Sequence, residues 1–442
     1  IVIGNDYESI YQAISGEFGM APSSDTLGSA DTPDTRKSVG VGFIAVYTLA
    51  IFSVWMAINT PATVTLALRI GTVDPDGYVH SYSLLAGLGT LVALLANPFF
   101  GRLSDRTTSR FGMRRPWMLG GLVGTAIGAV VVAAGPTIPV VLAGWLLMQA
   151  SVNATIASML AVIADYVPER QQGIMGSIAG VTVTAGLLVG TYFVQLVPEN
   201  PMAQMGIPAA IALVFTLLLC VVLPDRRLDP ADREPLSFKE FAGSFYLNPR
   251  TAPDLAWLIL ILFLFAIGPA AVATYTVYYL QDYIGIAEDR LATMTFYISL
   301  TMNGISVIVG LIAGRLADAT GRRKWLLAIT GICSGAGLFV MVIGASLPLF
   351  FVGSAIVGVG GGIFGGIYIS SATATMHDPK TYARDLGLVN IAYTLPYSIV
   401  PFAAPLLLGI GGGTSNYLAL FTVCGVVTLI GVPLLTRLKG LC

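Results

Sequence analysis

Twelve long apolar runs follow one another from residue 39 to the end of the chain, separated by short polar or proline-containing joints. A helix that crosses a lipid bilayer needs about 20 predominantly apolar residues, and each run is close to this length or exceeds it. Because most joints are short, neighbouring helices are expected to run antiparallel. The runs are predicted at 39–68, 79–101, 116–135, 137–164, 172–196, 206–223, 254–281, 290–314, 325–345, 347–376, 384–409 and 415–436.

Charged residues make up only 11% of the 442 residues, whereas hydrophobic residues make up 55%. Soluble domains carry about 25% charged residues. The excess of apolar surface is more than one soluble core can cover, so it is expected to face lipid. The sequence therefore predicts an all-α polytopic membrane protein in contact with the lipid bilayer. Its net charge of −1 provides no general attraction for nucleic acid, which is not expected as a partner.

The basic residues indicate which ends of the helices face the cytoplasm, because Lys and Arg accumulate in the cytoplasmic loops of membrane proteins. With the N-terminus inside, 21 of the 23 Lys and Arg residues fall on the cytoplasmic side, and only Arg69 and Arg290 fall outside. An odd number of spans would break this alternation. We therefore expect a multi-pass protein of the plasma (inner) membrane with both termini in the cytoplasm.

One long polar connection, the segment 224–253, divides the spans into six and six. It predicts an N-terminal six-helix bundle over 39–223, a cytoplasmic linker, and a C-terminal six-helix bundle over 254–442. Residues 1–38 are expected to be a cytoplasmic tail with a short amphipathic helix. Within residues 1–20, apolar side chains recur at helical spacing among acidic ones. This pattern fits either a weakly helical tail or a helix that docks on a protein partner.

A short pattern occurs once in each half of the chain. Gly101 and Asp105 precede one basic cluster, and Gly314 and Asp318, each 213 residues further on, precede another. The joint after the fourth span of each half repeats as well, at an offset of 214 residues. Internal repeats of this kind are typical of transporter folds, whose substrate site lies between the halves. The repeat predicts that the twelve transmembrane helices form two pseudo-symmetric six-helix bundles.

The two repeated carboxylates, Asp105 and Asp318, lie among arginines at the membrane edge. A carboxylate there needs a partner, either an arginine side chain or the positive N-terminus of a neighbouring helix. A contact that forms in one conformation and breaks in another is a conformational latch, and an ion pair worth about 1–3 kcal/mol would bias a two-state equilibrium. Gly101 and Gly314 are expected to allow close approach of backbones. The alternative is that these charges only set the topology.

The two loops resemble the signature loop of the major facilitator superfamily, in which a Gly-x-x-x-Asp pattern precedes a Gly-Arg-Arg cluster. The first loop, residues 104–116, is similar in particular to the glycoside/sucrose–proton symporter branch, although Met113 replaces one of its arginines. The resemblance covers residues 39–437 and implies that Asp105 engages the start of span eleven, near residues 383–387, when the inner side is closed. The predicted latch residues are Gly101, Asp105, Arg106, Arg114, Arg115, Asp165, Glu169, Arg170, Gly314, Asp318, Arg322, Arg323 and Arg384.

In this superfamily, spans 1, 4, 7 and 10 line a central cavity, so the resemblance implies that their polar and aromatic residues contact the solute. A sugar site needs directional hydrogen bonds and flat apolar faces, which amides and aromatic rings supply. Amides within a membrane also join helices to one another, so both roles stay open for each residue. The cavity candidates, three of them on spans 8 and 11, are Trp55, Asn59, Gln149, Asn153, Tyr275, Tyr278, Asn303, Tyr368, Asn390 and Tyr393.

Proton coupling normally requires a carboxylate or a histidine inside the membrane, and no span carries one near its middle. Three alternatives follow. An edge carboxylate such as Asp165 or Asp282 titrates, or the protein is a uniporter, or it is not a transporter.

The sequence predicts a secondary active or facilitative transporter that moves a small solute, a sugar or glycoside, by alternating access, with protons as a candidate coupling ion. The alternatives are an exporter of drug-like or lipid-like compounds, and a transporter-like scaffold subunit of a larger membrane complex that binds through residues 1–20. The four cysteines lack metal-ligand spacing. The sequence also shows no nucleophile–base set and no nucleotide loop, so we expect no enzyme, catalytic residue, metal or cofactor.

Overall fold

The computed structural model describes residues 38–229, 243, 247, 249–250, 252–344, 346–376, 382–411 and 415–439. Within these residues, twelve helices are long and apolar enough to cross a membrane. The predicted all-helical fold with twelve transmembrane segments is confirmed. The expected docking helix within residues 1–20 lies outside the described residues. So do most of the predicted tail 1–38 and most of the predicted linker 224–253.

The first half contains six spans, and the first of them is interrupted. Its helices are α2 (Val41–Thr60), the π-helix η1 (Pro61–Thr65) and α3 (Leu66–Val73), which form the first span, then α4 (Tyr78–Asp105), α5 (Arg115–Ala134), α6 (Ile138–Tyr166), α7 (Glu169–Leu196) and α8 (Pro201–Val222).

The second half repeats this series, and its first and fifth spans are interrupted. Its helices are α10 (Pro253–Tyr278) with the π-helix η3 (Tyr279–Ile284), α11 (Glu288–Thr320), α12 (Arg323–Val342), α13 (Leu347–Thr375), α14 (Tyr382–Thr394) with α15 (Pro396–Leu408), and α16 (Tyr417–Leu434) with the 3-10 turn η5 (Leu435–Arg437).

Proline accounts for two of these interruptions. A proline has no N–H, and its ring clashes with the carbonyl four residues earlier in a regular α-helix. Pro61 stands at the first position of η1, where the N–H of Leu66 bonds to the Pro61 carbonyl five residues back. Pro396 likewise begins α15, directly after α14 has ended. A wider turn or a break lets the span continue while its backbone groups stay bonded.

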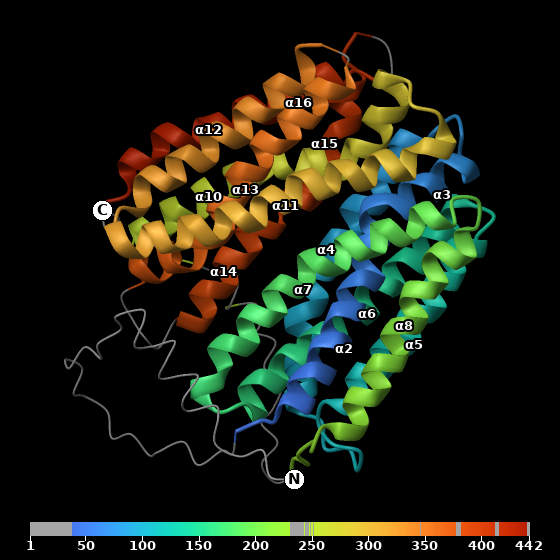
Figure 1. Cartoon of the computed structure of the whole chain (residues 1–442), viewed down its shortest axis with the longest axis vertical. Helices are drawn as coiled ribbons and strands as arrows, with labels where there is room; N and C mark the ends of the chain where they lie inside the picture. Colours follow the sequence, from blue (N-terminus) through green and yellow to red (C-terminus); the bar gives the residue numbers. More distant parts are fainter. Residues whose placement is uncertain are drawn as a thin grey trace. The chain divides into compact units, whose positions relative to one another are not determined.

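The helices of each half pack on one another (Figure 1). In the first half, α2 packs against α7 and α8, α5 against α6 and α8, and α4 against α6. In the second half, α13 packs against α11 and α12, and α16 packs against α10 and α12. Contacts between the halves are made by α4 with α15, by α7 with α11, and by α10 with α3 and η1.

Glycine pairs allow the tightest helix contacts, and one such pair repeats between the halves. A Cβ added at Gly128 of α5 would lie 2.7 Å from the carbonyl oxygen of Gly144 on α6. A Cβ added at Gly337 of α12 would likewise lie 2.7 Å from the carbonyl oxygen of Gly353 on α13. The second pair lies 209 residues after the first. In lipid, apolar side chains gain no hydrophobic free energy by moving from lipid to a helix interface. Helices therefore associate through van der Waals contacts, which close backbone approach at small residues increases.

Several helices extend beyond the apolar runs from which they were predicted. Helix α4 continues to Asp105, α6 continues through Asp165 to Tyr166, and α11 continues to Thr320. The expectation that Asp105 and Asp318 lie in loops is therefore wrong, because both occupy the last turn of a helix. Backbone hydrogen bonds within a helix do not depend on lipid, so a helix can continue beyond the apolar run. It ends where the sequence provides a stop signal, such as Gly321 after α11, which has a φ of 65°.

Candidate functional site

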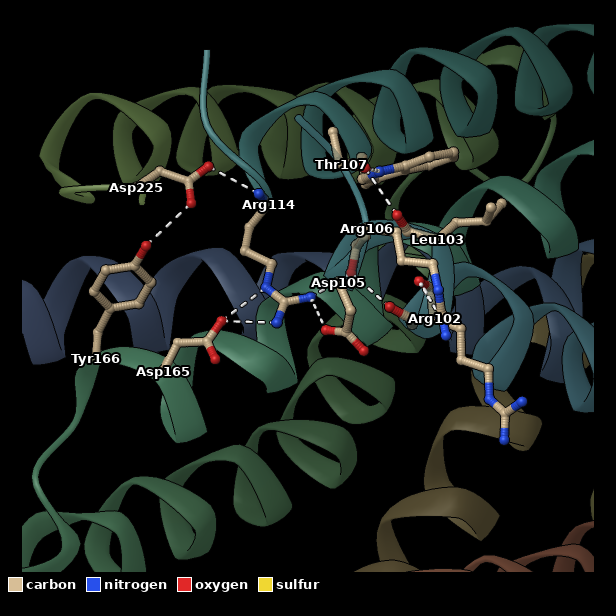
Figure 2. A network of polar contacts seen from close by, with 12 residues as sticks. Arg102, Leu103, Asp105, Arg106, Thr107, Arg114, Asp165, Tyr166 and Asp225 are labelled. Atoms are coloured by element: carbon tan, nitrogen blue, oxygen red, sulfur yellow. Dashed lines mark hydrogen bonds and ion pairs between the residues drawn. The ribbon is translucent and has the colours of Figure 1, made fainter. Parts of the chain in front are cut away.

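The centre of the predicted latch is the guanidinium group of Arg114, which precedes α5 and is 3% exposed. Its Nη1 lies 2.6 Å from a carboxylate oxygen of Asp105 on α4. Its Nε and Nη2 each lie 2.8 Å from one oxygen of Asp165 on α6. Figure 2 shows this guanidinium between the two carboxylates. The hydroxyl of Ser104 accepts a further bond from Nη1.

The charges of this group reinforce one another. Burial lowers the pKa of Arg114, but the carboxylates of Asp165 and Asp105 raise this pKa by more than burial lowers it. The resulting pKa lies above the usual value for arginine. A buried arginine is tolerated only when its charge is paired and hydrogen-bonded. The two carboxylates therefore fix both the charge and the position of this side chain, and they join the ends of α4 and α6 to the start of α5.

Other predicted latch residues have different partners. The guanidinium of Arg106 donates to the carbonyl of Arg102 at 3.1 Å. Arg115 donates to the carbonyl of Leu223, and Arg170 donates to the hydroxyl of Ser38. These contacts lie within the first half of the chain and do not include Asp105. Glu169 occupies the first turn of α7, where its charge suits the helix dipole.

The second copy of the pattern is not assembled in the same way. Asp318 and Arg322 are exposed, and their side chains have no ion-pair partner among the described residues. Arg323, at the start of α12, has a buried Nε without a hydrogen-bond partner in that same part of the chain. Arg384 pairs with its neighbour Asp385 at 2.8 Å. The structure thus brings together Asp105, Arg114 and Asp165, whereas Asp318, Arg322 and Arg323 form no such group with one another among the described residues of the second half.

The two signature glycines differ in how closely their backbones approach a neighbouring helix. A Cβ added at Gly101 would meet only the Cβ of Ala157, at 3.9 Å. A Cβ added at Gly314 would meet the carbonyl oxygen of Gly366 at 3.5 Å. A Cβ added at Gly366 on α13 would in turn lie 3.1 Å from the backbone N of Gly314. The expected close approach of backbones is therefore found at Gly314, and it is absent at Gly101. At Gly101 the neighbouring helix leaves space for a methyl group.

Two residues of this group were not found from the sequence. Asp225 accepts hydrogen bonds from the backbone N–H groups of Arg114 and Arg115, and Tyr166 donates to Asp225 at 3.1 Å. Asp225 is 111 positions away from Arg114 along the chain. No spacing in the sequence signals such a pair. The only indication was that Asp225 is a single acid directly before two arginines at the end of an apolar run.

A cavity of about 280 Å³ lies between the two halves. It is bordered by residues of the first span, α4, α6 and α7 from the first half, and of α10, α11 and α15 from the second. Its lining residues are Asn59, Ala62, Thr63, Leu66, Tyr82, Ala86, Thr90, Trp145, Gln149, Leu187, Val272, Ala273, Thr274, Thr276, Ile298, Ser299, Met302, Asn303 and Tyr397. Among the described residues that border it, none is Asp, Glu, Lys, Arg or His.

Several polar groups of the lining have no partner in the described part of the chain. The side-chain amide of Gln149 makes no hydrogen bond there. Asn59 and Asn303 each use one amide N–H on a backbone carbonyl, of Val183 and Ser299 respectively, and their side-chain oxygens stay unengaged. The hydroxyl of Thr274 likewise has no partner among these residues. The cavity therefore offers hydrogen-bond donors and acceptors, with the rings of Trp145, Tyr82 and Tyr397 beside them.

Three of the ten predicted cavity residues, Asn59, Gln149 and Asn303, border this cavity. Asn153 lies one helical turn from Gln149 and is bonded to the Gln149 carbonyl and to Asn97, so it joins α6 to α4.

The other candidates lie elsewhere. Tyr368 and Tyr393 stack on Phe364 within the second half, and Asn390 is exposed on α14. Trp55 is half-buried, and its indole N–H has no partner among the described residues.

Four tyrosines close the cavity toward the end opposite the arginine-rich loops. The hydroxyl of Tyr278 donates to the carbonyl of Ala67 at 2.9 Å, and the hydroxyl of Tyr275 lies 2.6 Å from that of Ser83. Tyr278 also packs against the rings of Tyr78 and Tyr82. Each of these contacts joins the second half to the first. The cavity candidates Tyr275 and Tyr278 thus lie in this tyrosine seal.

The tyrosine seal also has an acidic neighbour. Asp282, in η3, accepts a hydrogen bond from the hydroxyl of Tyr417 at 2.5 Å. It is half-buried and has no ion-pair partner among the described residues. Asp165, the other edge carboxylate considered for proton coupling, is occupied by Arg114.

Two helical halves with a polar cavity between them, closed at one end, define a membrane transporter for small solutes. The chain belongs to the Major Facilitator Superfamily, whose family model matches residues 39–401 and 298–439. It is a multi-pass membrane protein of that superfamily.

Relatives of the chain differ in what their names say they carry. The class E tetracycline resistance protein of Escherichia coli is 26% identical over 301 residues, which cover 66% of this chain and 70% of that protein. The proline/betaine transporter of Escherichia coli (strain K12) is 24% identical over 401 residues, or 82% of this chain and 78% of that one. Proton-associated sugar transporter A of Homo sapiens is 27% identical over 223 residues, 45% of this chain and 29% of that protein.

Solved structures show the same fold at low identity. The nucleoside transporter NupG superposes with a TM-score of 0.70 at 13% identity, covering 90% of this chain and 100% of that chain. An inward-facing, occupied bacterial homolog of the human lysosomal transporter Spinster superposes with a TM-score of 0.67 at 13% identity, covering 91% of this chain and 96% of that one.

Proposed function

We propose that the protein moves a small, neutral, hydroxyl-rich solute, a sugar or glycoside, across the plasma (inner) membrane by alternating access, with both termini in the cytoplasm. The observation that carries this proposal is the chemistry of the cavity. Its described lining has unengaged amide and hydroxyl groups next to aromatic rings and carries no charged side chain.

This lining suits a neutral polar solute better than a charged one. A charged group transferred into a low-dielectric site needs an opposite charge or a dense set of hydrogen bonds. A sugar needs donors and acceptors for its hydroxyls and a flat apolar surface for its ring faces. Gln149, Asn59 and Asn303 supply the first, and Trp145 and Tyr82 supply the second. The volume of about 280 Å³ is near the lower limit for ligand pockets, which favours a small solute.

The contacts around the cavity support alternating access. The tyrosine seal joins the halves at one end. At the other end, Asp105 pairs with Arg114 of its own half. In the reverse state, the seal would separate, and Asp105 would leave this pair to engage the start of α14. An exchange of partners with similar energies keeps both states accessible.

A second candidate, export of a drug-like compound, is favoured by one observation. Apolar residues such as Leu66, Val272 and Met302 make up much of the cavity lining, and the class E tetracycline resistance protein is among the relatives. The third alternative, a scaffold subunit, is less well supported, because a scaffold has no need for a polar cavity between its halves.

Uptake into proteoliposomes tests the proposal directly. The purified chain would be given a panel of radiolabelled monosaccharides, disaccharides and glycosides, each with and without an inward proton gradient. Betaine and tetracycline, which carry ionised groups, would serve as comparisons. Saturable uptake of at least one sugar, which requires a higher sugar concentration in Gln149→Leu, is the expected result. Transport of only tetracycline or only betaine would refute the sugar assignment. A dependence of sugar uptake on the proton gradient would identify a symporter, and its absence a uniporter.

A further inference from the structure

Asp225 is the third residue after α8 and begins the segment between the two halves. One of its carboxylate oxygens accepts hydrogen bonds from the N–H groups of Arg114 and Arg115, at 2.8 and 2.9 Å. The other oxygen accepts from the hydroxyl of Tyr166 at 3.1 Å. Figure 2 shows Asp225 between the tyrosine and the backbone of Arg114. All three of these hydrogen bonds come from the latch and its surroundings.

These contacts make Asp225 the anion at the N-terminus of α5. The first N–H groups of a helix have no partner within it, and a short polar side chain at the N-cap position usually accepts from them. The N-cap residue here is Arg114, which makes no such bond, because a guanidinium group has only donors and cannot accept from an N–H group. Asp225, which follows the end of α8, supplies an acceptor from outside α5. The positive N-terminal end of the α5 dipole also favours its negative charge.

The loop before α5 leaves space for this carboxylate only because of a glycine. Gly112 has φ of 104°, and a Cβ added there would lie 2.1 Å from an oxygen of Asp225. Beside it, the N–H of Met113 donates to the carbonyl of Arg226 at 3.0 Å. The chain that leaves α8 is thus bonded to the latch loop through both side-chain and backbone groups.

We propose that Asp225 is a positioning residue of the latch. By capping α5 it fixes the backbone of Arg114, and this places the guanidinium between Asp105 and Asp165. Without Asp225, Arg114 holds Asp105 less firmly, and Asp105 is freer to engage the second half. The population then shifts toward the state that is closed at the arginine-rich end. The consequence for populations rests on the proposed alternating-access function, although it does not depend on which solute is carried.

Distances between spin labels measure this population without any solute. The labels would be attached to cysteines at Ile174 on α7 and Thr320 on α11, which are exposed at the arginine-rich ends of the two halves, in full-length protein that lacks its native cysteines. Asp225→Ala is expected to change the ratio of short to long distances about fivefold in favour of the short ones, the size of effect that losing a helix N-cap has. Asp225→Asn keeps an acceptor and is expected to stay within about twofold of the parent protein.

Two further variants separate positioning from general stability. In an Arg114→Gln background, Asp225→Ala is expected to add less than about a twofold change, because both substitutions act through the same guanidinium. Asp76→Ala, a loss of an exposed acid at the opposite end, is expected to leave the distances unchanged. An unchanged distribution in Asp225→Ala, or an equal shift in both backgrounds, would overturn the proposal. Because no sugar is present, the failure of the sugar assignment would leave this result intact.

Discussion

Replacing Gln149 with leucine removes an amide that borders the cavity and makes no hydrogen bond within the described part of the chain. The two side chains are similar in size, so the cavity keeps its shape. The backbone carbonyl of Gln149 accepts a hydrogen bond from Asn153 of the same helix, and the substitution leaves this bond in place. The empty protein therefore loses no interaction, and its thermal stability is expected to stay the same or to rise.

The solute is expected to bind more weakly to this variant, for a calculable reason. A neutral hydrogen bond contributes about 1 kcal/mol net, and a solute hydroxyl left buried without a partner costs about 1–3 kcal/mol. Since 1.4 kcal/mol corresponds to a tenfold change in affinity, the dissociation constant for the solute should rise between about fivefold and 100-fold. The change should appear in the affinity, because the amide is placed to contact the solute and lies apart from the latch.

Gln204→Leu is the matched control. Gln204 is also a buried glutamine, but its amide donates to the carbonyls of Val197 and Pro198 at the start of α8, away from the cavity. This variant should lower the melting temperature and leave the affinity unchanged. Binding to the detergent-purified protein would be measured by calorimetry with the best-transported sugar, alongside thermal unfolding. An unchanged affinity in Gln149→Leu, at unchanged stability, would refute the assignment of this cavity to the solute.

Three further outcomes are expected. Asp105→Asn should slow transport several-fold and leave the solute affinity within about threefold, as measured by transport kinetics in proteoliposomes. The effect is modest because the carboxylate of this ion pair is half exposed and the pair contributes only about 1 kcal/mol. A large loss of affinity at unchanged turnover would contradict the latch. Tyr278→Phe removes the buried hydroxyl that donates to the Ala67 carbonyl. The equilibrium is expected to shift about tenfold toward the state in which the tyrosine seal is open, as measured by spin-label distances across that end. No shift would show that the seal does not hold the halves together. Gly128→Ala should lower the free energy of unfolding by about 1–3 kcal/mol, because its Cβ would meet the Gly144 backbone. Gly101→Ala should leave the free energy of unfolding unchanged. Equal effects of the two substitutions in thermal unfolding would argue against the helix spacing described above.

Part of the latch could be predicted from residue types alone. Asp105 was identified because a carboxylate at a membrane edge requires a partner, whereas Arg114 and Asp165 were implied by the resemblance to the superfamily's loops. These three residues do contact one another. The symmetric expectation for Asp318 was based on the repeat in the sequence, but a repeat does not require both copies to be paired in the same conformation. Asp225 was missed because its partners are backbone N–H groups, which no sequence pattern displays.

The cavity was harder to predict than the helices. Asn59, Gln149 and Asn303 stood out as amides in apolar runs, and they border it. Tyr368 and Tyr393 have the same chemical character, yet they stack on Phe364 inside one half. Residue type indicates which side chains need polar or aromatic partners, but only the rotation and the crossing of each helix decide whether those partners are solute, seal or neighbouring helix.

The sequence by itself determined the number of spans, the repeat between the halves and the side of the membrane on which the basic loops are expected. These features are local, since apolar length and charge act within one segment at a time. Only the tertiary structure decided that Arg114 meets Asp165 across 51 residues and Asp225 across 111, and that the tyrosines close one end of the cavity. Such contacts depend on how separate helices pack, and close packing is decided by side chains from distant parts of the chain acting together.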